Sequence, residues 1–321
     1  MRRFGGGCLM VASLVTCDPG STSSSPDDGA GLGSASTAGG PSAGSGNALP
    51  AGGAPSADAG AGGRLNPAGS AGLSGVAGGG SAGAGGAGSD GAFSLAWQDD
   101  FDTLDANAWE LENFTYDGNQ ATFTPENAKV ANGTLTIALT AAPAGSAKPY
   151  LGVEIRSVKT LTYGKVSASM RFAKGSGVVS GLVLFYTPYP NCDWNEIDIE
   201  HLGKTATSSQ FNAMVFTGTP NPTCTTSVSP TQDPLIAPLG FDAEADFHVY
   251  DIEWTPAGVK YIADGVLLRT WTKDIALLKQ AQNILLTIWA SNAPAWAGAI
   301  TDASAPTTAE LDWIKVYDWN G

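Results

Sequence analysis

From Phe93 onward, the chain consists mainly of short stretches in which apolar and polar residues alternate. Leu135, Ile137 and Leu139 alternate with threonine and alanine, and the same period of two recurs over 163–172. Because successive side chains of a β-strand point to opposite faces, this period predicts strands with one buried face. Further strands are expected at 151–158, 177–186, 195–202, 209–217, 247–254, 283–290 and 309–319.

Turn residues separate these stretches. Asn132-Gly133 divides 128–140 into two strands, and Asp264-Gly265 joins strands at 259–263 and 266–271, since an Asp-Gly pair favours a tight two-residue turn. Residues 274–281 are the only expected helix, and it is short. Many strands and little helix predict an all-β fold in which antiparallel sheets pack as a sandwich.

Composition changes sharply near residue 92. Of the 42 glycines, 27 lie at or before Gly91, and no aromatic residue occurs between Phe4 and Phe93. A segment of Gly, Ala, Ser and Pro buries too little apolar surface to offset the entropy lost on ordering. We therefore expect a leader at 1–17, a disordered linker at 18–92 and one folded domain at 93–321, a normal size for a single all-β domain.

The chain is acidic, with 30 Asp and Glu against 16 Lys and Arg and a formal net charge of −14 at pH 7. Nucleic acids and anionic membrane surfaces attract basic patches, so this balance argues against both as partners. A neutral polymer and a positively charged polymer are both compatible with it.

The first residues are typical of an export signal. Two arginines precede an apolar run that ends at Cys17 and is too short to span a membrane. The sequence Leu14-Val15-Thr16-Cys17 resembles a bacterial lipoprotein cleavage box, although Thr16 is larger than the residue usual before that cysteine. Two alternatives stay open, a plain signal peptide and a lipid anchor on Cys17, and both place the protein outside the cell or on a bacterial cell surface.

Two of the four cysteines, Cys192 and Cys224, lie in the expected folded domain. In an exported protein they favour a disulfide, against the alternative of two free thiols. The two histidines, His201 and His248, are too few and too separated to indicate a zinc site. No phosphate-binding loop or Ser/His/Asp pattern is found, so no cofactor is expected to be required.

The stretch 194–200 places three carboxyl groups on one face of a strand. Glu196, Asp198 and Glu200 alternate with Ile197 and Ile199. The isoleucines can anchor the strand in a core while the carboxyl groups point the other way. Like charges on one face repel each other, so a purely structural role would carry a cost without a return. The alternatives are a solvated acidic strand and a calcium-binding cluster.

Glycoside hydrolysis needs such a set of carboxyl groups. A retaining enzyme uses two of them, about 5–5.5 Å apart, one as the nucleophile and one as the acid/base. Residues four apart on a strand have Cα atoms about 13 Å apart, so Glu196 and Glu200 would have to lean together across a bent strand. Asp198 between them can share a proton, which keeps one carboxyl charged and the other protonated near neutral pH.

Around this triplet the chain resembles glycoside hydrolase family 16, and within it the bacterial lichenases, which act on β-1,3-1,4-glucan. The resemblance covers nearly the whole expected domain and implies a β-jelly roll of two antiparallel sheets with a concave substrate cleft. The segments that carry it are 154–157, 163–164, 177–180, 194–204, 210–212, 241–243, 247–248, 264–267 and 312–313.

The same resemblance implies residue roles. Glu196 would be the nucleophile and Glu200 the acid/base, with Asp198 assisting. Polar contacts to the sugar are implied for Glu154, Arg156, Gln210 and Asn212. Trp194 and Trp289 would be aromatic platforms on which sugar rings stack, with core packing as the alternative. A structural calcium is implied at Asp312 and the carbonyl oxygen of Gly133, where the alternative is an ordinary exposed aspartate.

Four positions depart from the lichenase pattern, and all were expected in or beside the cleft: His201, Met214, Phe185 and Asn195. They leave the glycan open. The uninterrupted Glu-x-Asp-x-Glu spacing resembles lichenases and xyloglucan-active members, whereas laminarinase-type members carry one more residue before the last Glu. The sequence thus predicts a monomeric, retaining endo-hydrolase of mixed-linkage β-glucan, a polysaccharide. The alternatives are a transglycosylase, a member active on xyloglucan or β-1,3-glucan, and a non-catalytic glycan-binding surface protein.

Overall fold

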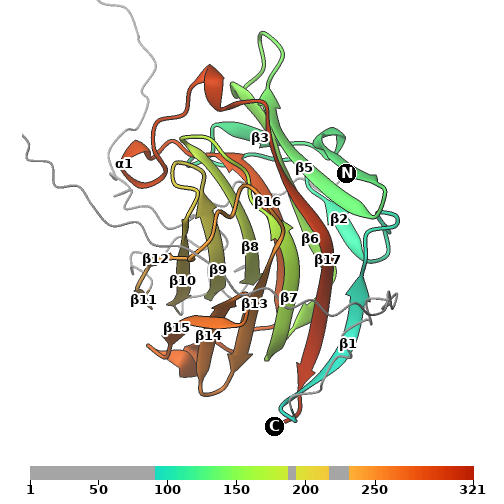
Figure 1. The fold of residues 1–321 in the computed structure, drawn as a ribbon, viewed down its shortest axis with the longest axis vertical. Helices are drawn as coiled ribbons and strands as arrows, with labels where there is room; N and C mark the ends of the chain where they lie inside the picture. Colours follow the sequence, from blue (N-terminus) through green and yellow to red (C-terminus); the bar gives the residue numbers. More distant parts are fainter. Residues whose placement is uncertain (1–90, 187–192, 217–230) are drawn as a thin grey trace, which may run out of the picture. The chain divides into compact units, whose positions relative to one another are not determined.

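The computed structural model describes residues 91–186, 193–216 and 231–321. Within them nearly all regular structure is β-strand, and two antiparallel sheets, A and B, enclose an apolar core (Figure 1). This is the all-β sandwich that the alternating pattern predicts. The expected leader and nearly all of the expected linker lie outside the described residues, as do Cys17 and the pair Cys192 and Cys224.

Sheet A forms around the long strand β17, which pairs with β7 on one side and with β5 and then β1 on the other. From β7 the order continues through β13 and β14 to β15, and β4 pairs with β5. The strands are β1 (Phe93–Asp99), β4 (Ala128–Ala131), β5 (Thr134–Ala141), β7 (Gly164–Arg171), β13 (His248–Thr255), β14 (Gly258–Ala263), β15 (Val266–Trp271) and β17 (Thr307–Trp319).

Sheet B has the order β2–β6–β16–β8–β9–β10, with β11 and β12 paired to the far side of β10. The start of β6 also pairs with β3 (Ala121–Phe123) and with β5, which joins the two sheets. The remaining strands are β2 (Trp109–Leu111), β6 (Tyr150–Leu161), β8 (Val178–Tyr186), β9 (Trp194–Leu202), β10 (Ser208–Phe216), β11 (Thr231–Gln232), β12 (Leu235–Pro238) and β16 (Gln282–Ala290).

The core lies between the sheets and is built from alternate residues of each strand. Ile197 and Ile199 of β9 are fully buried in it, as are Val166 and Ala168 of β7. Burying one such aliphatic side chain stabilises the fold by roughly 1.5–3 kcal/mol, so the isoleucines fix which way β9 faces. The residues between them point to the other face of sheet B. We name that face, which carries Glu196, Asp198 and Glu200, the acidic face.

The turns follow from local sequence. Asn132 and Gly133 have φ of 53° and 74°, and Asp264 and Gly265 have φ of 45° and 77°. Two successive positive φ angles match the twist of a hairpin, and Asn, Asp and Gly tolerate them best. Both expected turns are confirmed.

The expected helix at 274–281 is wrong apart from a single 3₁₀ turn, η2 (Ile275–Leu277). The segment between β15 and β16 is too short to offset the cost of helix nucleation. The other short turns are η1 (Pro125–Asn127), α1 (Pro294–Ala297) and η3 (Asp302–Ser304). Among the described residues, no helix has the length and apolar character needed to cross a membrane.

Candidate active site

Strand β9 lies in the interior of sheet B, between β8 and β10. Its register with both neighbours runs from one end of the strand to the other without a shift, so no bulge interrupts the alternation. Glu196, Asp198 and Glu200 therefore form one row along the acidic face. This is the arrangement that the spacing of the three residues predicts.

The three carboxyl groups have no cation among their cross-strand neighbours. On β10 these neighbours are Met214, Asn212 and Gln210, and on β8 they are Phe185, Val183 and Gly181. Glu196, Asp198 and Glu200 are at most 5% exposed. None of the ion pairs within the described part of the chain includes them. A buried carboxyl without a counterion resists ionisation.

Glu196 receives a hydrogen bond from its own strand. The indole Nε1–H of Trp194 donates to Oε2 of Glu196 at 2.7 Å. Burial raises the pKa of Glu196 to about 7, while the bond from Trp194 and an interaction with Asp198 limit the rise. These donors favour the ionised form, so Glu196 is prepared to lose its proton near neutral pH.

Glu200 receives its hydrogen bond from the neighbouring strand. The amide Nε2 of Gln210, directly opposite on β10, donates to Oε2 of Glu200 at 3.0 Å. Burial raises the pKa of Glu200 to about 8, the charge of Glu196 adds to the rise, and Gln210 opposes it. The pKa of Asp198 is raised well above its ordinary value by burial and then by both glutamates. Near neutral pH the row thus combines a carboxyl that ionises more readily with two that retain a proton more readily.

Glu154 and Arg156 of β6 lie on the same face, with β16 and β8 between β6 and β9. The Arg156 guanidinium reaches Glu154 Oε1 at 3.4 Å and Glu112 Oε1 at 3.0 Å. Burial still raises the pKa of Glu154 to about 7, because Arg156 offsets only part of the desolvation. Glu154 also contributes to the raised pKa of Glu196, so these polar residues belong to the same electrostatic unit.

Aromatic clusters lie near both ends of the carboxyl row. At the Glu196 end, Trp194 contacts Phe185 edge-on, with ring centroids 5.4 Å apart. At the Glu200 end, Trp289 contacts Tyr116 and Trp296, with centroids 5.8 and 5.9 Å away. Neither Trp194 nor Trp289 belongs to the core between the sheets. Each is buried instead in a smaller apolar cluster on the acidic face, so packing and sugar stacking both stay open for these tryptophans.

The family model for glycosyl hydrolases family 16 matches residues 115–315, which include every strand of the acidic face except β2. The chain belongs to glycosyl hydrolase family 16. It is therefore a glycosidase, as the carboxyl row and the resemblance predicted.

Known relatives of this family 16 protein agree in fold and sequence. It is 34% identical over 207 residues to a β-glucanase of Paenibacillus polymyxa, a match that covers 64% of this chain and 77% of the relative. A β-glucanase of Fibrobacter succinogenes is 32% identical over 54% of this chain but only 48% of its own length. The crystal structure of a lichenase from a mouse hindgut metagenome superposes with a TM-score of 0.60 at 29% identity, over 69% of this chain and 98% of that one. The jelly-roll sandwich is thereby confirmed.

Two of the four departures from the lichenase pattern lie behind β9, which corrects the expectation for them. His201 is fully buried on the core side, where it stacks on Phe172 and contacts Ser209 and Glu244 at 3.1 and 3.2 Å. Asn195 also faces away, and its Oδ1 accepts hydrogen bonds from the backbone of residues 279 and 280. Both share the alternation of the core isoleucines, so neither can touch a ligand on the acidic face.

The other two departures, Met214 and Phe185, flank Glu196 on the acidic face, as expected. Asn212 lies there too, opposite Asp198. Its Oδ1 accepts a hydrogen bond from the backbone of Asp233 at 3.2 Å, and its Nδ2 has no partner among the described residues. A buried amide donor without a partner is suited to a sugar hydroxyl.

Two residues of the site were missed at the sequence level, Tyr116 and Trp296. The pKa of Tyr116 is raised well above its ordinary value, first by burial and then by Glu154, Glu200 and Glu196, so its hydroxyl lies near the carboxyl groups. Trp296 belongs to the single helical turn α1. Both come from segments without strand alternation. An isolated aromatic in such a segment was the only available signal.

The residues expected to hold calcium lie at the edge where β1 and β5 follow each other along β17. Asp312 is exposed at an irregularity of β17, and Gly133 lies in the turn before β5, close to the carbonyl oxygen of Asp100. Oxygen ligands of this kind fit calcium. The described residues contain no cluster of three or more acidic, His or Cys side chains able to hold a metal, so backbone carbonyls would have to complete the shell.

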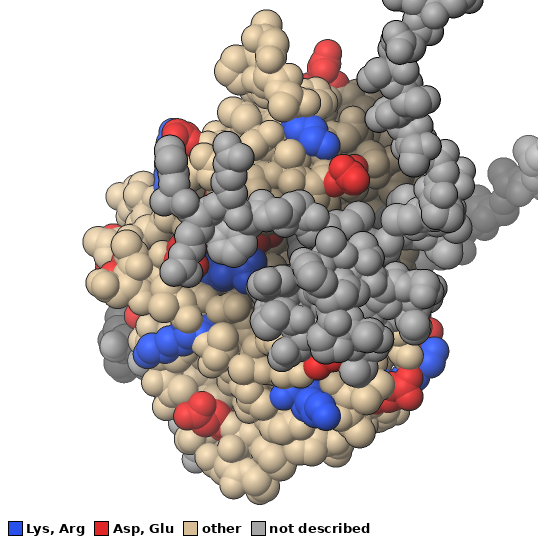
Figure 2. Space-filling view, turned by 180° about the vertical axis from the view of Figure 1, so that it is seen from behind, with Lys and Arg blue, Asp and Glu red and all other residues tan. Residues whose placement is uncertain are grey.

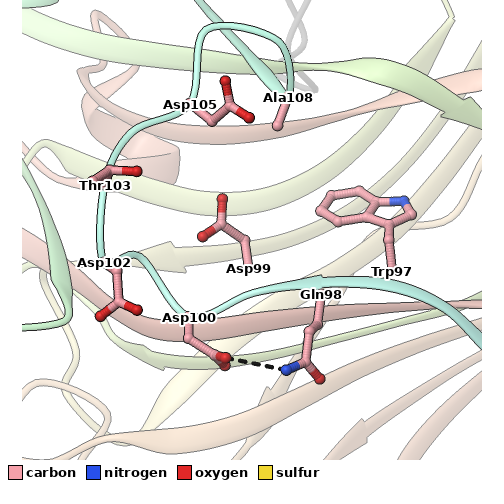
Figure 3. A pocket seen from close by; sticks show the side chains of 8 residues that line it. All are labelled: Trp97, Gln98, Asp99, Asp100, Asp102, Thr103, Asp105 and Ala108. Atoms are coloured by element: carbon pink, nitrogen blue, oxygen red, sulfur yellow. Dashed lines mark hydrogen bonds between the residues drawn. The ribbon is translucent and has the colours of Figure 1, made fainter.

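A pocket of about 300 Å³ lies near the same edge and is lined by residues between Trp97 and Ala108 (Figure 3). Its wall contains several aspartates, but Asp99 is already bound by Trp109 Nε1 at 2.7 Å and by the backbone of Phe101 at 2.8 Å. On the face seen in Figure 2, the acidic and basic side chains are spread among uncharged ones. The row on β9 differs from the pocket because its three carboxyl groups are buried, whereas Asp100, Asp102 and Asp105 of the pocket wall are exposed.

Proposed function

We propose that this family 16 glycosidase is an endo-hydrolase of a β-glucan, with mixed-linkage β-1,3-1,4-glucan as its substrate, and that it retains anomeric configuration. The observation that carries the proposal is the uninterrupted row of three carboxyl groups on β9, buried without a cation and with raised pKa values. The β-glucanase and lichenase relatives support this choice of substrate.

In the first half of the reaction, the ionised carboxylate of Glu196 attacks the anomeric carbon of the sugar. Glu200 donates its proton to the glycosidic oxygen, and the bond between that oxygen and the anomeric carbon breaks. The product is a covalent glycosyl ester on Glu196. The lower pKa of Glu196 relative to Glu200 supports this assignment, since it leaves the proton on Glu200 when only one of the two ionises.

In the second half, the ionised Glu200 takes a proton from water as the water oxygen attacks the anomeric carbon. The ester bond to Glu196 breaks and the carboxylate is restored. Asp198 keeps its proton and interacts with Glu196, which limits the build-up of negative charge in the row. Two displacements at the same carbon give overall retention.

The surroundings of the row support a neutral glucan as the ligand. Trp194 lies at one end, and Trp289 with Trp296 lies at the other, so sugars on both sides of the scissile bond would meet an indole. Aromatic faces stack on the apolar faces of sugar rings. Between them Glu154, Arg156 and Asn212 supply polar groups for hydroxyls, and no basic cluster is present that would favour an acidic polysaccharide among the described residues.

The test is hydrolysis by the full chain of barley β-glucan, lichenan, xyloglucan and laminarin, followed by reducing ends and by NMR of the first anomer released. We expect the largest rates on barley β-glucan and lichenan, with release of the β-anomer. Glu196→Gln should be inactive on all four. An α-anomer as first product, or full activity in Glu196→Gln, would overturn the mechanism, and products longer than the substrate in the presence of an oligosaccharide acceptor would indicate transfer instead of hydrolysis.

Calcium at Asp312 and Gly133 is a separate proposal, supported by the placement of Gly133 near the carbonyl oxygen of Asp100 and by the exposure of Asp312. Calcium should raise the melting temperature by a few degrees in the wild type and not in Asp312→Asn, because a ligand stabilises only the state that binds it. An equal shift in both proteins would exclude this position.

Export, acylation at Cys17 and a Cys192–Cys224 disulfide are proposed on sequence grounds, together with a monomeric state. Intact mass of the protein isolated from its native membrane and medium fractions, with and without reductant, tests the first three. Sedimentation tests the fourth. A diacylglycerol mass on the mature N-terminus would distinguish the lipid anchor from a plain signal peptide.

A further inference from the structure

A chain of hydrogen bonds leads to Glu200 from outside sheet B. The indole Nε1–H of Trp296 donates to Oε1 of Gln210 at 2.8 Å, and Nε2 of the same amide donates to Oε2 of Glu200 at 3.0 Å. Gln210 is 2% exposed. Both ends of its amide are therefore held by protein groups.

The direction of this amide matters because its two ends are nearly equal in size and opposite in hydrogen-bonding character. The NH₂ end can donate to Glu200 in either protonation state. The oxygen end can only accept a proton held by Glu200, and it would repel the carboxylate. An indole N–H is a donor and never an acceptor, so Trp296 requires the oxygen of Gln210 to face it. The NH₂ end must then face Glu200.

The position of Trp296 is itself fixed by the segment around α1. The ammonium group of Lys204 donates to the carbonyl oxygen of Trp296. The backbone N–H of Gly177 donates to Ala297 O, and that of Ser291 donates to Gly177 O, both at 2.8 Å. A Cβ at Gly298 would clash with Ser176 Oγ, so the two loops are in close contact. The indole is thus presented from a braced segment.

We propose that Trp296 is a positioning residue for the acid/base, because its indole N–H fixes the Gln210 amide so that this amide donates to Glu200 throughout the reaction. The inference rests on the proposed function, in which Glu200 is the acid/base, and deepens it. Trp296 acts here through Gln210 and not through the bond that is broken.

The consequence concerns the second half of the reaction, in which Glu200 must be ionised. Burial and the charge of Glu196 both raise the pKa of Glu200, and the donor from Gln210 opposes them. The other titratable groups facing this region are Asp198 on the same strand and Tyr116. None of these is a cation, so the Gln210 amide is the group that favours the ionised form. If the Gln210 amide were flipped, its oxygen would accept a hydrogen bond from protonated Glu200 and stabilise the acid form.

The test is Trp296→Phe, which keeps an aromatic ring, although a smaller one, and removes the N–H donor. In the full chain, the alkaline limb of the kcat profile and the carboxyl ¹³C titration of Glu200 should both move upward by roughly one to two pH units, the size expected for one hydrogen bond to a charged group. Trp289→Phe is the matched control. It changes the neighbouring indole in the same way and should raise KM without moving either titration.

A double-mutant cycle separates positioning from direct sugar contact. Gln210→Met should move the Glu200 titration upward by itself, and Trp296→Phe added to it should give no further shift. An unchanged titration in Trp296→Phe, or the same additional shift in the Gln210→Met background, would overturn the proposal. The ¹³C titration needs no substrate, so it decides the point even if the wild type hydrolyses no β-glucan, a result that would remove the proposed function instead.

Discussion

Strands β9 and β13 both carry carboxyl groups two residues apart on one face, but the residues opposite them differ in charge. On β13, Asp251 and Glu253 lie opposite Ser167 and Lys165 of β7. The Lys165 ammonium is 3.3 Å from Asp251 Oδ2 and 3.6 Å from Glu253 Oε1. On β9, the groups opposite Glu196, Asp198 and Glu200 are uncharged. Sheet A places a cation opposite its carboxyl groups, and sheet B places none opposite Glu196, Asp198 and Glu200.

The difference shows how the same local pattern leads to structure in one place and to chemistry in the other. Burial by itself lowers the pKa of Lys165, but Asp251 and Glu253 raise it above its ordinary value, so Lys165 is held as a cation. On β9 burial raises the pKa of all three carboxyl groups, and repulsion adds to the rise, from Glu154 for Glu196 and from other row members for Asp198 and Glu200. With pKa values of about 7 and about 8, Glu196 and Glu200 can exchange protons near neutral pH, which acid/base catalysis requires.

The largest expected effect comes from neutralising one carboxyl in each set. Glu196→Gln should lower kcat on barley β-glucan by at least about 10³-fold, because it removes the proposed nucleophile. Asp251→Asn is the matched change on β13 and should leave kcat within about twofold, since Lys165 keeps Glu253 as a partner. Steady-state kinetics with purified variants measures both. Comparable losses in the two variants would mean that the comparison between the strands has no functional meaning.

The next effect is the pH dependence of kcat/KM in the wild type. Glu196, with a pKa of about 7, must be ionised, so activity should fall as pH drops through about 7. Glu200, with a pKa of about 8, must keep its proton, so activity should fall as pH rises through about 8. Because the groups interact, the two limbs belong to the row as a whole.

An aryl β-glucoside with a good leaving group sharpens this test. Its departure needs little help from an acid, so Glu200→Gln should retain formation of the glycosyl-enzyme on it and lose the alkaline limb of that step. A profile that is flat from pH 5 to 9 in the wild type on barley β-glucan would contradict the raised pKa values.

A smaller effect concerns the free energy of unfolding. Removing a charge should raise it on β9 and lower it at the β13 ion pairs. A carboxyl with a raised folded-state pKa contributes stability below its unfolded pKa of about 4.3, and this is lost as pH rises through the folded value, here about 8. Glu200→Gln should therefore be more stable than the wild type at pH 8.5, by ~1–3 kcal/mol, and equal to it near pH 4. Urea unfolding at the two pH values measures the difference. Equal stability at pH 8.5 would show that the row carries no electrostatic strain.

Much of the fold follows from the sequence because the long strands carry a clear period. The alternation in β5, β7, β9 and β17 predicts their faces, and the Asn-Gly and Asp-Gly pairs predict their turns. Strands of two to four residues, such as β2, β3, β11 and β12, carry too few residues to show a period, so they could only be found in three dimensions. The one expected helix failed for the related reason that the ten residues between β15 and β16 specify little.

The site was predictable as far as alternation reaches. It placed the three carboxyl groups together, and it also places His201 and Asn195 with the core isoleucines, which the expectation of cleft positions for them overlooked. Trp296 and Tyr116 contribute to the site from irregular segments, where no alternation of apolar and polar residues indicates which side chains face it. The absence of a cation opposite β9 depends on which strands become its neighbours. Strand order cannot be predicted from a local sequence pattern.

The smallest effect tests the cation on β13 directly. Lys165→Met keeps the aliphatic stem and removes the charge from between Asp251 and Glu253, which should lower the free energy of unfolding at pH 7 by ~1–2 kcal/mol, since the pair is only partly exposed. The raised pKa of Lys165 means that its stabilisation is complete below about pH 10.4 and is lost as pH rises through the folded value. The gap between the two proteins should thus close in strong alkali, while kcat on β-glucan stays within about twofold of the wild type at pH 7. A large loss of kcat would place β13 within the catalytic machinery. An unchanged free energy of unfolding would mean that Lys165 does not stabilise the fold through Asp251 and Glu253. Either outcome would remove the contrast with β9, because that contrast requires the cation to act on stability and its absence to act on chemistry.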